Sequence, residues 1–121
     1  MMQEQGTVEM LFPYCKEGHH VGVRQLLAAN ASVEQVDGHS RTALYHACRQ
    51  GHRLVAELLI ASGASINQST HKGNTPLLAA CHHGHLECAR LLLETNAQAD
   101  HADNDGYTPL LISAPKKPRH K

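Results

Sequence analysis

Eleven histidines and four cysteines are the residues of this chain best suited to chemistry, because imidazole and thiolate groups bind zinc and act as bases or nucleophiles. The densest group is Cys81-His82-His83-Gly84-His85. Zinc requires four ligands that converge on a point about 2.0–2.3 Å from each. The adjacent His82 and His83 would diverge by about 100° on a helix, and the spacing matches no common zinc-ligand pattern. We therefore expect no metal site and no bound cofactor.

The cysteines and several histidines recur with a fixed period instead. Cys15, Cys48 and Cys81 are 33 residues apart, and Gly-His dipeptides begin at positions 18, 51 and 84 with the same spacing. Packed helices lie about 8–10 Å apart, beyond the roughly 7 Å Cα separation that a disulfide spans. These three thiols are therefore predicted to be small buried packing residues that cannot pair with one another. The Gly-His imidazoles are predicted to hydrogen-bond backbone groups at turns.

The elements that would position these residues are pairs of short helices. In the third unit, Thr75 can cap a first helix that has Pro76 at its first position and runs to about residue 83. A second helix is expected over residues 86–94, and Asn96, a residue that tolerates the left-handed conformation, should end it. Leucines at equivalent positions would pack between units in two columns: Leu11, Leu44, Leu77 and Leu110, and Leu26, Leu59 and Leu92.

Composition restricts the class of protein further. The chain has 121 residues, one Phe, three Tyr and no Trp, so its core must consist of small aliphatic residues. The formal charge is zero, but the last six residues contain four Lys/Arg, which leaves seven basic against eleven acidic residues elsewhere. We see no signal peptide and no apolar run long enough to cross a membrane. We expect a cytoplasmic or nuclear location, or both, and no membrane partner.

The repeated motifs resemble those of the ankyrin repeats, a family with a 33-residue unit and a T-P-L-H-x-A signature. The corresponding segments here begin at Thr42, Thr75 and Thr108, and the clearest reads Thr-Pro-Leu-Leu-Ala-Ala. The signature histidine is replaced by Tyr45, Leu78 and Leu111. The resemblance covers roughly residues 9–114. It implies an all-α fold, a solenoid of stacked helix-turn-helix units joined by β-turn or hairpin loops.

Two units depart from the family pattern. Pro13 falls inside the first helix of the first unit, and we expect it to shorten or delay that helix. The fourth unit breaks into Pro115 and a basic tail before a second helix can form, so the C-terminal end is expected to lack a cap and to be open to self-association. The expected segments are an N-terminal segment (1–8), a degenerate first repeat (9–37), a second repeat (38–70), a third repeat (71–103), an incomplete fourth repeat (104–114) and the basic tail (115–121).

The resemblance favours a non-catalytic module that binds another protein. The family layout leaves no cleft where a cysteine could meet a base, and glycines occur singly rather than in a phosphate-binding loop. Two alternatives stay open. The chain could be a truncated isoform or fragment of a larger ankyrin-repeat protein. It could also be a nuclear regulator that uses its tail for import or nucleic-acid contact, although its acidic body argues against nucleic-acid binding.

In ankyrin repeats, partners typically dock on the loop tips and on the concave side of the first helices. Transferred position by position, the helix ends contribute Lys16, Glu17, Arg49, Gln50, His82 and His83. The loops contribute His39, Arg41, His71, Lys72, Asn74, Asn104, Asp105 and Tyr107. Together these residues would form a basic, histidine-rich strip that becomes acidic at Asp103 and Asp105. Such a strip favours an acidic partner segment, bound more tightly as the pH falls from about 7.5 to 6 and less tightly in salt.

Overall fold

A computed structural model describes residues 11–109 of the chain. These residues form helices connected by short turns and by longer hairpin-like loops, with an isolated antiparallel bridge between Val36 and Thr42. The described helices are α2 (Leu11–Glu17), α3 (His20–Ala28), α4 (Ala43–Gln50), α5 (Arg53–Ala61), α6 (Pro76–His82) and α7 (Leu86–Glu94). The predicted all-α stack of helix-turn-helix units is confirmed.

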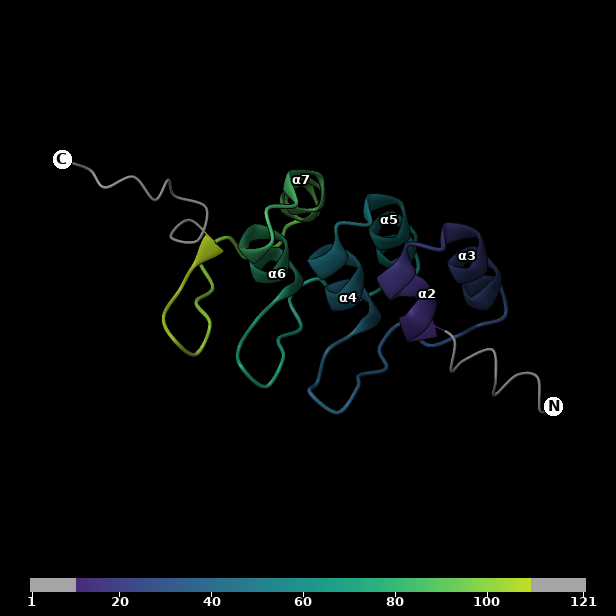
Figure 1. The fold of residues 1–121 in the computed structure, drawn as a ribbon, viewed down its shortest axis with the longest axis horizontal. Helices are drawn as coiled ribbons and strands as arrows, with labels where there is room; N and C mark the ends of the chain where they lie inside the picture. The colour runs from purple at the N-terminus through teal and green to yellow at the C-terminus, as the bar shows by residue number, and fades with distance from the viewer. Residues whose placement is uncertain (1–10, 110–121) are drawn as a thin grey trace.

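The helices lie in two layers (Figure 1). Each first helix packs against its own second helix, so that α2 pairs with α3, α4 with α5 and α6 with α7. Across units, α2 contacts α4 and α4 contacts α6, which gives a first layer, while α3, α5 and α7 form a second layer in the same order. The long loops extend away from both layers on one side of the stack (Figure 1). Equivalent residues of successive units are thereby arranged in columns along the stack.

Local sequence determines where the helices begin and end. The Thr42 hydroxyl accepts a hydrogen bond from the Tyr45 N–H, and Thr75 does the same for Leu78, so both threonines cap a helix as the motif predicts. The second helices are followed by residues with positive φ: Asn30 (69°), Gly63 (94°) and Asn96 (72°). Asn and Gly adopt this left-handed conformation more readily than other residues, which explains why these positions end the helices.

The core is made of the predicted leucine columns. Leu11, Leu44 and Leu77 are at most 1% exposed, and Leu26, Leu59 and Leu92 at most 4%; Leu110 lies outside the described residues. Cys15 and Cys48 are fully buried, but Cys81 is only half-buried, so the prediction that all three are buried is wrong for the last. Cys81 lines a groove of the third unit together with Leu77 and Leu86.

Pro13 lies inside the first helix. Helix α2 includes the two residues before Pro13 and ends at Glu17, the position equivalent to Gln50 at the end of α4. The residue equivalent to the first residue of α4 is number 10, which lies outside the described residues. The expected shortening or delay of this helix therefore stays a prediction.

Candidate protein-interaction surface

The repeat period arranges the fourteen predicted binding residues in columns. Most of them are exposed, whereas Arg41, Arg49 and Asn74 are half-buried. The columns at the helix ends are Lys16–Arg49–His82 and Glu17–Gln50–His83, and those at the loop tips are His39–Lys72–Asp105, His71–Asn104 and Arg41–Asn74–Tyr107. The fold thus arranges residues from distant parts of the chain in columns at the helix ends and at the loop tips.

The first of these columns carries a basic side chain in every described unit, a lysine, an arginine and a histidine. Lys16, Arg49 and His82 lie in the last turns of α2, α4 and α6, where positive charge is favoured by the helix dipole. We call these three residues the cation column. Neighbouring helix axes lie about 8–10 Å apart, so its members are expected to be about one such step from each other.

His82 and its neighbour His83 differ in their surroundings. His82 Nε2 lies 3.9 Å from Asp103 Oδ2, and this pair is charged only when the imidazole is protonated. The pKa of His83 is lowered by partial burial and by the positive charges of Arg49, His85 and His82. His83 therefore becomes charged at a lower pH than an ordinary histidine.

Each loop tip is stabilised by one side chain at a second repeating position, which the repeat motifs alone did not reveal. Asp37, Thr70 and Asp103 are spaced by 33 residues, and each side chain accepts hydrogen bonds from backbone N–H groups two and four residues later. The donor–acceptor distances lie between 2.9 and 3.3 Å. Asp and Thr commonly stabilise turns in this way, so residue type and period together could have identified the position.

This role corrects the predicted acidic end of the strip. The side chain of Asp103 is only 7% exposed, and its carboxylate is occupied by the loop N–H groups of Asp105 and Tyr107 and by the nearby His82. Asp105 is exposed. The acidic end therefore consists of Asp105 rather than of both residues.

Backbone hydrogen bonds join successive loop tips. The His71 N–H donates to the His39 carbonyl at 3.1 Å, and the Asn104 N–H donates to the Lys72 carbonyl at 3.0 Å. The Asn104 side chain also donates to the His71 carbonyl at 3.0 Å. The tips are thus held in register by main-chain bonds, and Asn104 is partly committed to this structural role.

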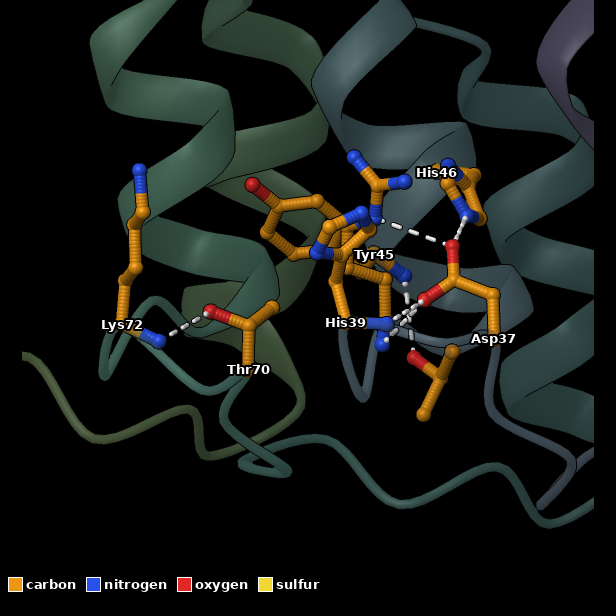
Figure 2. Close-up of polar contacts among 8 residues, drawn as sticks. Asp37, His39, Tyr45, His46, Thr70 and Lys72 are labelled. Carbon is orange, nitrogen blue, oxygen red and sulfur yellow. Dashed lines mark hydrogen bonds and ion pairs between the residues drawn. The ribbon is translucent and has the colours of Figure 1, made fainter.

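Arg41 is engaged inside the protein rather than free for a partner. Its Nε donates to Asp37 Oδ2 at 2.9 Å, and the same oxygen accepts a hydrogen bond from His46 Nε2 at 3.0 Å (Figure 2). Burial alone would raise the pKa of Asp37, but hydrogen bonds from Arg41, His39 and His46 hold it well below its usual range. Conversely, the pKa of His46 is lowered, chiefly by burial, although Asp37 opposes the shift.

Asn74 occupies the position equivalent to Arg41 in the next unit. Its Oδ1 is buried and has no hydrogen-bond partner among the described residues. Thr70 at the Asp37-equivalent position offers a short hydroxyl that already accepts the loop N–H groups of Lys72 and Asn74. The two half-buried members of this column therefore contribute less to an outer surface than predicted.

The histidines of the Gly-His dipeptides are structural, but their bonds differ from unit to unit. His19 Nδ1 accepts from the Gly22 N–H at 3.1 Å and caps α3. His52 Nε2 instead donates to the Lys16 carbonyl of the preceding unit at 2.9 Å. The His85 ring packs against Gly51 of the preceding unit, where an added Cβ would meet its Nδ1 at 2.5 Å. These rings connect neighbouring units as well as forming turns.

Comparison with known families identifies the architecture. A family model described as "Ankyrin repeats (3 copies)" matches residues 3–70 and again residues 55–120. The chain belongs to the ankyrin-repeat family. A search of curated proteins returned no match. Ankyrin repeats are generally protein–protein interaction modules, and none of the helices described in residues 11–109 is long and apolar enough to cross a bilayer.

Two thiols of this ankyrin stack, Cys15 and Cys48, are poor candidates for catalysis. Burial raises the pKa of Cys15 to about 12. The pKa of Cys48 is raised by its hydrogen bond with Cys88 and by burial, and neither thiol reaches the surface. Within residues 11–109, no three His, Cys, Asp or Glu side chains are grouped so that they could hold a metal ion. The absence of a cofactor and of catalysis stays a prediction.

The ankyrin stack exposes an apolar groove on its third unit. Leu86 and Leu93 of α7 are 72% and 50% exposed. The positions equivalent to Leu93 in the earlier units, Leu27 and Ile60, are half-buried because the following unit covers them. The groove runs between α6 and α7 and reaches Pro109. Self-association through this end stays a prediction, and the residues from 110 onward, including the basic tail, lie outside the described residues.

Proposed function

We propose that this ankyrin-repeat chain is a non-catalytic module that binds an acidic segment of a protein partner across the first layer and the loop tips. The observation that carries the proposal is the cation column, which places a basic side chain at the same point of each described unit. Its members are separated by far more sequence than any local motif spans, so only the stack makes them one surface.

The charges of two members of this column, Lys16 and Arg49, are available to a partner. Arg53, on the second layer, forms ion pairs with Glu57 at 2.7 Å and Glu87 at 3.4 Å. Lys16 and Arg49, in contrast, make no ion pair with any residue between 11 and 109. A cation without an internal ion pair can bind a partner's carboxylate without first breaking an existing ion pair.

The pH dependence of binding should follow the histidines of this surface. Binding is expected to strengthen as the pH falls from about 7.5 to 6, because protonated imidazoles attract a carboxylate. His83 should contribute only at the lower end of this range or below it, since burial, Arg49, His85 and His82 lower its pKa. At His82, part of the gained charge is offset by Asp103. The affinity should therefore increase gradually as the pH falls. Added salt should weaken binding because it screens the charges.

Affinity capture with paired variants tests the proposal. The chain and the triple variant Arg49→Ala/His82→Ala/His83→Ala are compared for bound proteins at about 50 and 300 mM salt. The control Arg24→Ala/Arg90→Ala removes exposed cations from the second layer. We expect the triple variant to lose partners that the control retains. Equal retention by both variants at matched thermal stability would refute the proposed surface.

A nuclear role is a second candidate, favoured by the four Lys/Arg in the last six residues. Such a run can act as an import signal or contact phosphates. Deletion of residues 115–121 separates this role from partner binding: it should abolish nuclear accumulation while leaving capture by the cation column intact. Unchanged localisation after deletion would remove this candidate.

The possibility of a truncated isoform is tested separately by whether the purified chain unfolds cooperatively as a monomer.

A further inference from the structure

The spacing of the cation column restricts the backbone conformation of the bound segment. Lys16 and Arg49 occupy equivalent positions of α2 and α4, which are in direct contact, so their backbones are one helix step of about 8–10 Å apart. The loop-tip carboxylate of Asp37 already binds Arg41 and His46. Glu17, which follows Lys16 at the end of α2, is an exposed carboxylate and weakens the attraction at that position. A segment with two carboxylates about one helix step apart would satisfy both cations at once.

The first layer gives little support for an amphipathic helix. Large apolar side chains that are exposed in residues 11–109 lie on the second layer (Val21, Leu54, Leu86 and Leu93) or in the loops (Val36 and Tyr107). Helices α2, α4 and α6 expose none. A helix bound in a groove depends on apolar anchors at helical spacing. A helical partner with acids seven residues, or about 10.5 Å, apart would match the spacing of the cation column. It would find no exposed apolar surface on the first layer to pack against.

An extended segment matches if it adopts the polyproline II conformation. That helix has three residues per turn and rises about 3.1 Å per residue, so every third side chain returns to the same face after about 9.3 Å. In a β-strand, side chains on one face are two residues or about 6.6 Å apart, or four residues and about 13 Å apart. Among extended conformations, the polyproline II repeat alone places side chains on a single face at the step of the stack.

Building on the proposed function, we propose that the bound segment is an extended, polyproline II-like peptide with acidic side chains at every third residue. Consecutive acids contact Lys16 and Arg49, and a third reaches His82, where Asp103 weakens the attraction. The peptide therefore lies along the stack and crosses the first helices rather than running parallel to them. The repeat period of this chain sets the acidic period of its partner.

Synthetic peptides of identical composition test whether acidic residues at every third position are preferred. Fluorescein-labelled peptides carry four glutamates, either in four Pro-Pro-Glu repeats or grouped together, and their affinities for the full chain are measured by fluorescence anisotropy at about 50 mM salt. Grouped glutamates concentrate the negative charge, so charge alone would favour the grouped peptide. We expect the repeated peptide to bind about three- to tenfold more tightly, since exposed ion pairs contribute roughly two- to fivefold each.

Single substitutions test whether the preference for the repeated peptide depends on the cation column. Lys16→Gln and Arg49→Gln should each weaken the repeated peptide about two- to fivefold and reduce its advantage over the grouped peptide. Arg24→Gln, on α3, is the matched control and should change neither. Circular dichroism melts verify that the variants are folded. Equal affinity for both peptides, or an advantage that survives Arg49→Gln, would overturn the inference.

The outcomes also separate this inference from the proposed function. An alanine-rich helical peptide with glutamates seven residues apart provides the competing arm, and tighter binding of this helix would refute the extended conformation. If no acidic peptide binds but capture of a protein partner still depends on Arg49, His82 and His83, the proposed function stands and the peptide register is wrong. If capture is independent of these residues too, both are wrong.

Discussion

Replacing Asp37 should reveal how strongly a loop-tip carboxylate holds this stack together. Its oxygens accept hydrogen bonds from the N–H groups of His39 and Arg41, from the Arg41 guanidinium and from the His46 ring. In Asp37→Ala, the two backbone bonds should cost about 1 kcal/mol each. The partly exposed Arg41 pair should add about 0.5 kcal/mol, and the buried His46 bond about 1 kcal/mol. We expect a loss of about 3.5 kcal/mol in the free energy of unfolding.

The neighbouring unit provides a matched control. Thr70 makes the same two backbone bonds through its hydroxyl, so Asp37→Thr should keep them and lose only the contacts with Arg41 and His46. Its cost should be about half that of Asp37→Ala. Urea denaturation followed by circular dichroism at pH 7 measures both values. Equal costs for the two variants would show that the backbone bonds do not stabilise the loop tip.

The pH dependence of this cost is a further check on the reasoning. Because the pKa of Asp37 is lower in the folded chain than in the unfolded one, its contribution is present above the unfolded pKa of about 3.9 and is lost as the pH falls towards the folded value. The difference between the wild-type chain and Asp37→Ala should therefore shrink between about pH 5 and pH 3. A difference that stays constant over this range would contradict the assigned charge interactions.

Three other predictions follow from single contacts. Because burial lowers the pKa of His46, the folded chain should lose stability as the pH falls below about 6.5, and His46→Gln should reduce this loss in urea titrations at pH 7 and 5.5. Gly51→Ala should cost at least about 1 kcal/mol more than Gly84→Ala, since both have positive φ but only the first would bring a Cβ to 2.5 Å from His85 Nδ1; equal thermal shifts would argue against this close approach. Thr75→Ala should cost about 1 kcal/mol by removing a helix cap, and Thr75→Ser should restore most of it.

The sequence by itself determined the scaffold. The period of 33 residues located the helix pairs, the leucine columns and the capping threonines, because each of these depends on local hydrogen bonding or on apolar spacing. The same period also indicated that Cys15, Cys48 and Cys81 could not form disulfides with one another. Local rules did not show that α2 would continue on both sides of Pro13, nor that Cys81 would be left half-buried.

The tertiary structure alone decided which polar residues are free. Arg41 and Lys16 look equally available in the sequence, yet Arg41 is bound to Asp37, and Lys16 has no ion-pair partner in residues 11–109. Likewise His46 occupies the variable position of the motif that begins at Thr42, and nothing in that motif indicates that it is 2% exposed and bonded to a carboxylate nine residues away. The physical reason is that repeat periodicity fixes backbone position, whereas the availability of a charge depends on the side chains that approach it from neighbouring loops and units.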